Sequence, residues 1–194
     1  MHKGRLEAFS DGVLAIILTI MVLELKVPKE ASLAALAALW PVWAAYVLSY
    51  CIVFLVWLNH HDIFAGVNEV NARLLFINGG LLFCVSLIPF ATAFAGETHW
   101  ASPLAVALYG AVMVAVSLMF VRLRLAAALQ AKDEAAAAHH RREAALSTRL
   151  AVLFVAGTAL GWFYPRMALV VFAATPLVMR LRRKPGASAD GTRD

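Results

Sequence analysis

Six apolar stretches dominate the sequence and constrain its fold. They cover about residues 9–25, 40–58, 74–95, 103–121, 150–164 and 167–179. A helix needs about 20 mostly apolar residues to cross a bilayer, and with 62% hydrophobic and 15% charged residues the chain could not cover a soluble surface. The sequence therefore predicts an all-α integral membrane protein, with six transmembrane helices in one membrane domain over residues 1–183.

Positive charges fall almost entirely on one side of this topology. Of the 17 Lys and Arg residues, all but Lys26, Lys29 and Arg166 lie in segments that share a side with the N-terminus. Since Lys and Arg accumulate in cytoplasmic loops, we expect both termini to be cytoplasmic. The net charge of +5 is explained by this bias and by anionic membrane lipid, so no nucleic-acid partner is expected.

Two segments lie outside the apolar stretches. Residues 122–149 are rich in Ala, Leu, Glu, Lys, Arg and Gln, which are strong helix formers. We expect the fourth span to continue into the cytoplasm as a helical connection, turn, and return. Residues 184–194 contain Pro, Gly, Ser and Asp without apolar periodicity, which predicts a disordered cytoplasmic tail.

Two ionisable residues, Arg5 and Asp11, stand at the start of the first span. Such groups at a membrane helix are costly and are usually paired and functional. The alternative is structural: Arg5 lies at the interface, and Ser10 and Asp11 cap the helix.

The first span also carries an aliphatic stripe. At about 100° per residue, Ile16, Ile20 and Leu23 share one face with Val13 and Val27. Thr19 lies at the edge of this stripe and Asp11 lies on the opposite side. The stripe fits a pore lining, a lipid contact or a helix contact equally well, because all three are apolar in a membrane.

A second group of ionisable residues has side chains that could bind a metal ion or act in catalysis. His60, His61 and Asp62 end the second span, but no His pair has the i, i+4 spacing of a metal site. We therefore expect that the protein binds no metal ion or cofactor and is not an enzyme. We expect these side chains to form hydrogen bonds at the membrane interface. His139 and His140 are expected to be solvated.

Small residues and prolines predict local packing. Gly157 and Gly161 form a G-x-x-x-G pattern that permits close helix approach. Asn78, before two glycines, is expected to hydrogen-bond to a neighbouring helix. Pro89 and Pro176 are expected to kink or end their helices.

The N-terminal half resembles the transmembrane protein 175 family of potassium channels. The residues that carry this resemblance are Arg5-x-x-x-Phe9-Ser10-Asp11-Gly12-Val13-x-Ala15-Ile16-x-x-Thr19, Trp57-x-x-His60-His61-x-x-Phe64, Phe76-x-Asn78 and Leu87-Ile-Pro89-Phe90. Animal members carry the six-span unit twice and prokaryotic members once, as here. The resemblance therefore implies a channel in the plasma membrane of a prokaryote.

The resemblance also implies an assembly and a site. Four copies would form a homotetramer, with the first helix of each subunit lining a central pore for potassium ions. The hydrophobic constriction would lie at Ile16, with further layers at Ile20 and Leu23 and with Thr19 beside it. Ile20 stands where the family often has leucine, and selectivity for potassium is expected to be modest. A structural network behind the pore would contain Arg5, Phe9, Ser10, Asp11, Trp57, His60 and Asn78.

Two rival classes of function remain at this stage. A small secondary or proton-coupled transporter would use Arg5, Asp11 and His60 to bind substrate or relay protons. A catalytic membrane protein would use His60, His61 and Asp62 with a metal ion.

Overall fold

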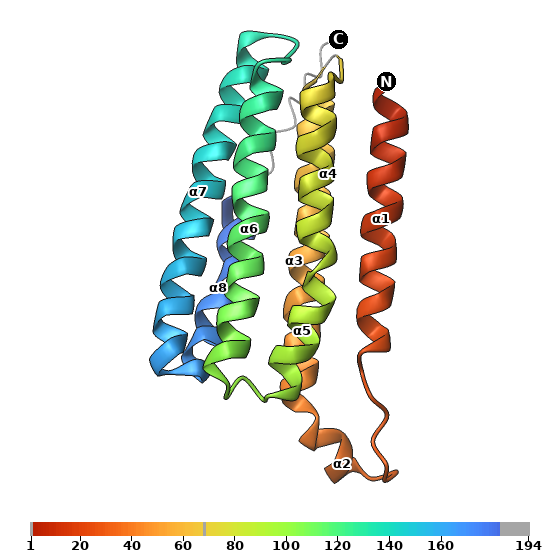
Figure 1. Ribbon diagram of the computed structural model, residues 1–194, viewed down its shortest axis with the longest axis vertical. Helices are drawn as coiled ribbons and strands as arrows, with labels where there is room; N and C mark the ends of the chain where they lie inside the picture. Colours follow the sequence, from red (N-terminus) through yellow and green to blue (C-terminus); the bar gives the residue numbers. More distant parts are fainter. Residues whose placement is uncertain (1, 68, 183–194) are drawn as a thin grey trace, which may run out of the picture.

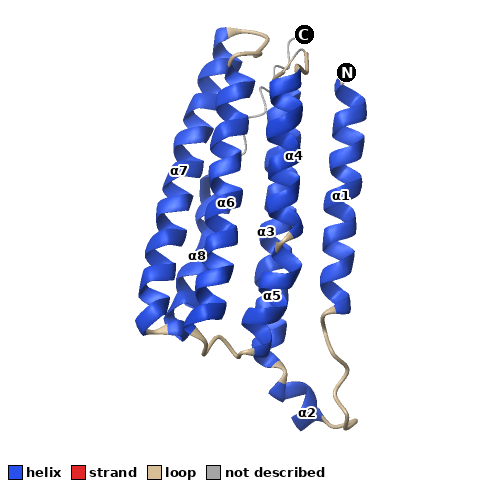
Figure 2. Ribbon diagram, viewed as in Figure 1, coloured by secondary structure: helices blue, strands red, loops and turns tan. Residues whose placement is uncertain are grey.

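The computed structural model of the protein describes residues 2–67 and 69–182, and within them the chain is helical apart from loops and turns (Figure 2). The helices run up and down along one long axis (Figure 1). They are α1 (Lys3–Leu23), α2 (Leu33–Ala38), α3 (Trp40–Ala65), α4 (Ala72–Ser86), α5 (Ile88–Glu97), α6 (Pro103–Ala128), α7 (Glu134–Phe163) and α8 (Pro165–Arg182).

Five helical stretches in the described residues are long and apolar enough to cross a membrane. They are Lys3–Leu23, Trp40–Ala65, Ala72–Glu97, Pro103–Ala128 and Glu134–Phe163. The prediction of an all-helical chain with several helices of membrane-spanning length and composition is thus confirmed. The sixth span predicted at 167–179 falls in α8, which is not among the five, so the count of six stays a prediction. The predicted tail at 184–194 lies outside the described residues.

The first helix begins earlier than predicted. It starts at Lys3, and its N-cap residue His2 forms no side-chain capping bond. Ser10 and Asp11 therefore lie two turns inside the helix, and the interpretation of these residues as a helix cap is wrong. The helix ends at Leu23, so Val27 is not part of its aliphatic stripe.

The third predicted span consists of two helices. The helix breaks at Leu87, between α4 and α5, and Pro89 lies in the first turn of α5. A proline lacks the N–H needed inside a helix but fits the first turn, which explains the position of the break. The short helix α2 was not predicted; its N-cap is Ser32, whose side chain accepts a hydrogen bond from the Ala35 N–H at 3.1 Å.

A long antiparallel hairpin of α6 and α7 forms the edge of the bundle away from α1 (Figure 1). In it the helix of the fourth predicted span continues to Ala128, and α7 returns from Glu134. Small residues allow the close contact: a Cβ added at Gly110 would lie 1.7 Å from Thr158 Oγ1, and one added at Gly161 would lie 2.4 Å from Val106.

One end of the bundle gathers the N-terminus and two loops. Lys3 donates a hydrogen bond to the Val67 carbonyl at 3.3 Å, and Val67 forms an isolated bridge with Ala131 in the α6–α7 turn. At the other end, Lys26 forms an ion pair with Glu97, and this pair raises the pKa of Lys26. The N-terminus and the loop that holds Lys26 therefore lie at opposite ends of the bundle.

Candidate functional site

The helix α1 has one face turned into its own subunit. Its buried side chains recur every three or four residues, the spacing of one helix face, and they are Leu6, Ser10, Leu14, Ile17 and Met21. The helix makes its contacts with α3, α4 and α5. It stands at the edge of the bundle (Figure 1), so the rest of its surface is left uncovered by the subunit.

The aliphatic stripe lies on this uncovered surface. The exposed fractions are 58% for Ile16, 41% for Ile20 and 77% for Leu23. Thr19 is exposed beside them. The four residues predicted to form the constriction therefore share one face that the subunit does not use for its own packing.

The hydroxyl of Thr19 has a defined direction. It donates a hydrogen bond to the Ile16 carbonyl at 2.8 Å. A hydroxyl has one proton and two lone pairs, so the exposed Thr19 hydroxyl keeps acceptor capacity beside the aliphatic stripe. This side chain can offer an oxygen to a cation without losing its bond to the helix.

A groove of about 420 Å³ runs beside the stripe, between α1 and the break of α4 and α5. It is lined by Val13, Ile16, Ile17, Ile20, Glu24, Ser86, Pro89 and Phe90. Apart from Glu24 and Ser86 its lining is apolar. An apolar helix or lipid chain is the kind of occupant that such a groove accepts.

Behind the stripe, three buried polar side chains form a directed chain of hydrogen bonds. His60 Nε2 lies 2.8 Å from Asn78 Oδ1, Asn78 Nδ2 donates to Ser10 Oγ at 3.0 Å, and Ser10 donates to the Leu6 carbonyl at 2.9 Å. Because Asn78 Oδ1 can only accept, His60 Nε2 carries the proton. The chain joins α3, α4 and α1 through three of the residues assigned to the predicted network, which are Ser10, His60 and Asn78.

Asp11 and Trp57 form a separate contact. Trp57 Nε1 donates to Asp11 Oδ1 at 2.9 Å, on the exposed side of the α1–α3 contact. Within the described residues the Arg5 side chain has no hydrogen-bond or ion-pair partner, and the Phe9 ring is 63% exposed. The structure of one subunit therefore joins three of the seven predicted network residues in one chain of hydrogen bonds and two in a separate contact, and Arg5 and Phe9 take part in neither.

His60, His61 and Asp62 do not converge on a common point. His60 bonds to Asn78 inside the bundle, whereas Asp62 forms an ion pair with Arg124 at 2.7 Å. His61 is exposed. The described residues contain no group of three or more His, Cys, Asp or Glu side chains placed to hold a metal ion.

Asp62 instead belongs to a cluster that the sequence did not reveal. Arg124 is 2% exposed, and it reaches Asp62, the Asn59 carbonyl at 3.4 Å and His140 Nδ1 at 3.3 Å. His139 Nε2 lies 3.0 Å from Asp62. The expectation that His140 is solvated is wrong: it is fully buried over Gly66, where a Cβ would lie 2.8 Å from its Nε2.

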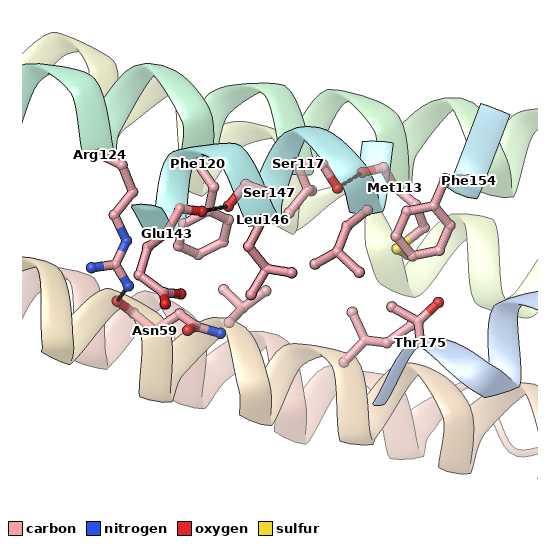
Figure 3. Close-up of a pocket in the computed structure, with 14 residues that line it drawn as sticks. Asn59, Met113, Ser117, Phe120, Arg124, Glu143, Leu146, Ser147, Phe154 and Thr175 are labelled. Carbon is pink, nitrogen blue, oxygen red and sulfur yellow. Dashed lines mark hydrogen bonds between the residues drawn. The ribbon is translucent and has the colours of Figure 1, made fainter. Parts of the chain in front are cut away.

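An internal cavity of about 50 Å³ lies among α3, α6, α7 and α8, away from α1. Asn59, Arg124 and Glu143 are at one end, and Phe154 and Thr175 are at the other (Figure 3). Its lining is mainly apolar. Since no residue of α1 lines it, this cavity is distinct from the exposed stripe.

Comparisons with known proteins place the chain in a family. The family model described as the endosomal/lysosomal potassium channel TMEM175 matches residues 5–89. A potassium channel of Chryseobacterium sp. (strain P1-3) is 39% identical over 180 residues, which is 92% of each chain. The human endosomal/lysosomal proton channel TMEM175 is 33% identical over 103 residues, which is 20% of its length.

A solved structure agrees with these matches. It is the crystal structure of a lysosomal potassium-selective channel TMEM175 homolog from Chamaesiphon minutus, with a TM-score of 0.79 and 31% identity over 93% of this chain and 97% of that one. The likeness thus extends over α6, α7 and α8, beyond the residues that the family model matches. The chain belongs to the TMEM175 family.

Proposed function

We propose that this protein is a potassium channel in which α1 lines the ion path. The observation that carries this proposal is the two-faced character of α1. One face is packed into the subunit through Leu14 and Ile17, and the other presents Ile16, Thr19 and Leu23 outward. Its relatives from Chryseobacterium and Chamaesiphon minutus are described as potassium channels, which supports the same function here.

Four subunits form the channel in this proposal, with six spans in each and both termini in the cytoplasm. A single α1 cannot enclose a path, but four α1 helices around an axis bring four copies of Ile16 together. The sixth span is α8, and residues 1–183 form the channel domain, with 122–149 as its cytoplasmic hairpin. The basic residues of the N-terminus and the α6–α7 turn then face the cytoplasm.

The ring of Ile16 side chains acts as a hydrophobic constriction. An ion passes such a ring only by shedding part of its hydration shell, and an apolar constriction can also close by losing its water. Potassium is larger than sodium and holds its water less tightly, so it is penalised less. The outward lone pairs of Thr19 partly replace the lost water, which gives a leak-type channel with modest selectivity.

The network behind the stripe holds α1 in place. Ser10 joins the pore helix to Asn78 on α4 and through it to His60 on α3. These groups act as supports and do not meet the ions. The Arg5 side chain has no partner among the described residues and the Phe9 ring is exposed, so their role in the channel would come from contacts between subunits.

Recordings from purified protein in planar bilayers test this function. With potassium on one side of the bilayer and sodium on the other, the reversal potential of the unitary currents should show that potassium permeates more readily than sodium. If the reversal potential instead follows an imposed proton gradient, potassium is not the main permeant ion. Saturable flux coupled to a second solute, without unitary currents, would favour the transporter alternative based on Arg5, Asp11 and His60.

A further inference from the structure

We propose that His140 is an acid-sensitive lock, whose protonation releases the α6–α7 turn from the end of α3. Three ionisable side chains surround its ring, which are Asp62 from α3, Arg124 from α6 and His139 from α7. We call these four residues the histidine lock. All four lie outside the apolar stretches predicted to cross the membrane.

The His140 ring is held in one protonation state. It is fully buried, and its Nδ1 lies 3.3 Å from the Arg124 guanidinium. A guanidinium can only donate, so Nδ1 is the acceptor and the proton of the neutral ring is on Nε2. Within the described residues Nε2 has no hydrogen-bond partner, because it lies over Gly66, where a Cβ would be 2.8 Å away. The site therefore accepts the ring in its neutral form.

A second proton on His140 does not fit this arrangement. It would replace the acceptor at Nδ1 with a donor and place two positive groups side by side in the protein interior. Burial and then the positive charge of Arg124 lower the pKa of His140 from its ordinary 6.5 to about 4. A histidine whose pKa is lowered in the closed state binds more protons in the open state. The closed lock therefore loses stability as the pH falls from about 6.5 towards 4.

Asp62 does not change its charge over this pH range. Its carboxylate accepts hydrogen bonds from Arg124 at 2.7 Å and from His139 Nε2 at 3.0 Å. Burial disfavours the charge of this carboxylate, but the hydrogen bond from His139 and the charge of Arg124 outweigh burial and lower the pKa of Asp62. Asp62 therefore stays ionised while His140 takes up its proton.

The other ionisable neighbours do not oppose this effect. His139 is half-exposed, so a second proton on its ring leaves its bond to Asp62 in place and is screened by water. Glu143 lies one turn after His140 in α7, and its side chain points into the internal cavity (Figure 3). His140 is therefore the group whose protonation opens the lock.

The lock closes over a segment that also contacts α1. Beside the His140 ring, the Lys132 N–H of the α6–α7 turn donates to the Gly66 carbonyl at 3.3 Å, and the same turn forms the isolated bridge with Val67. The Val67 carbonyl accepts the hydrogen bond from Lys3 at the start of α1. Release of the turn therefore frees the segment that anchors α1. Only the step from α1 to the ion path rests on the proposed function.

Hydrogen–deuterium exchange of the purified full-length protein tests the lock. The reporters are the backbone amides of the α6–α7 turn, including Lys132, whose N–H bonds to Gly66. Exchange is measured at about pH 8 and about pH 5, the limits between which histidine changes its charge, and is divided by the rate of an unstructured chain at the same pH. In the wild type the opening of the turn should increase about tenfold or more at the lower pH, whereas α4 and α5 should keep their protection.

Three variants identify the residue responsible. His140→Asn keeps an oxygen acceptor near Arg124 but cannot take up a proton, so the opening of its turn should be the same at both pH values. Gly66→Ala puts a methyl group in the space of the His140 ring, so its turn should already be open at the higher pH. The control His139→Asn should respond to acid as the wild type does.

Five results would overturn the lock. They are a wild-type turn that ignores pH, an equal loss of protection throughout the bundle, an acid response that persists in His140→Asn, wild-type protection in Gly66→Ala, and loss of the response in His139→Asn. The readout does not depend on currents. A protein that conducts potassium without acid release refutes only the lock, whereas a protein that shows the release but never conducts contradicts only the proposed function.

Discussion

At the scale of single residues, the polar groups around α1 have distinct structural roles. Ser10, His60 and Asn78 are buried, and their hydrogen bonds run from His60 as donor to Asn78 and from Asn78 to Ser10. Asp11 is exposed and accepts one hydrogen bond from Trp57. A buried group that loses its partner costs more than an exposed one that can turn to water, so the two sets should respond differently to mutation.

Asn78→Leu should lower stability, because it leaves the His60 Nε2–H buried without an acceptor. An orphaned buried donor costs about 1–3 kcal/mol. Thermal unfolding of the purified protein in detergent measures this loss. The double variant His60→Leu with Asn78→Leu should recover part of it, since both partners are then apolar. If the double variant is as unstable as the sum of the single variants, the hydrogen bond contributes nothing specific.

Asp11→Ala should cost only about 0.5–1.5 kcal/mol, the net contribution of one ordinary hydrogen bond. Asp11→Asn should stay close to wild type, because its amide oxygen still accepts from Trp57 Nε1. The same unfolding measurement distinguishes the two variants. A large loss for Asp11→Asn would mean that the negative charge itself is needed, with Arg5 of a neighbouring subunit as the first partner to examine.

At the scale of helices, the sequence predicts their existence better than their ends and pairings. Apolar length alone indicates the spans, and helix formers between Arg122 and Arg149 indicate the hairpin. The start of α1 was misplaced because Ser10 and Asp11 are good caps that here lie inside a helix. The burial of His140 depends on the missing side chain of Gly66, 74 residues away in sequence, which no local pattern reveals.

The α6–α7 hairpin should be sensitive to one methyl group. In Gly110→Ala the new Cβ would meet the Thr158 side chain at 1.7 Å, and overpacking of this kind typically costs about 1–3 kcal/mol. Unfolding of the variant in detergent checks this. Gly79→Ala is the matched control, because nothing lies within 4 Å of a Cβ at Gly79. Equal stability of the two variants would show that the hairpin can separate without cost.

At the scale of the whole molecule, the proposed channel depends on the surface of α1 that one subunit leaves uncovered. The sequence predicted which residues of α1 share a face, and the structure places Ile16, Ile20 and Leu23 outside the subunit core. Neither observation distinguishes lipid from pore, because an aliphatic side chain suits both. The way in which the subunits assemble decides between the two.

The protein should form a homotetramer. In the proposed channel one subunit supplies one pore helix, and the apolar groove beside Ile16 and Ile20 gives a neighbouring subunit a surface to cover. Native mass spectrometry in detergent should give a main species of four chains. A protein that is only monomeric or dimeric, under conditions in which it still conducts, would rule out a path enclosed by four α1 helices.

The most direct test of the central claim is to place an amide on each face of α1 and compare the currents. Ile16→Asn changes the proposed constriction. Val22→Asn is the matched control, because Val22 is 47% exposed and lies about 120° around the helix from Ile16. Ile17 is less suitable, because it is buried in the subunit and an amide there would disturb folding.

Bi-ionic recordings of both variants with potassium and sodium give the measurement. A ring of amides holds water, so Ile16→Asn should conduct larger currents with a reduced preference for potassium. Val22→Asn should keep the conductance and reversal potential of the wild type. If Ile16→Asn leaves both quantities unchanged, or if Val22→Asn reproduces its effect, the exposed face of α1 does not line the ion path.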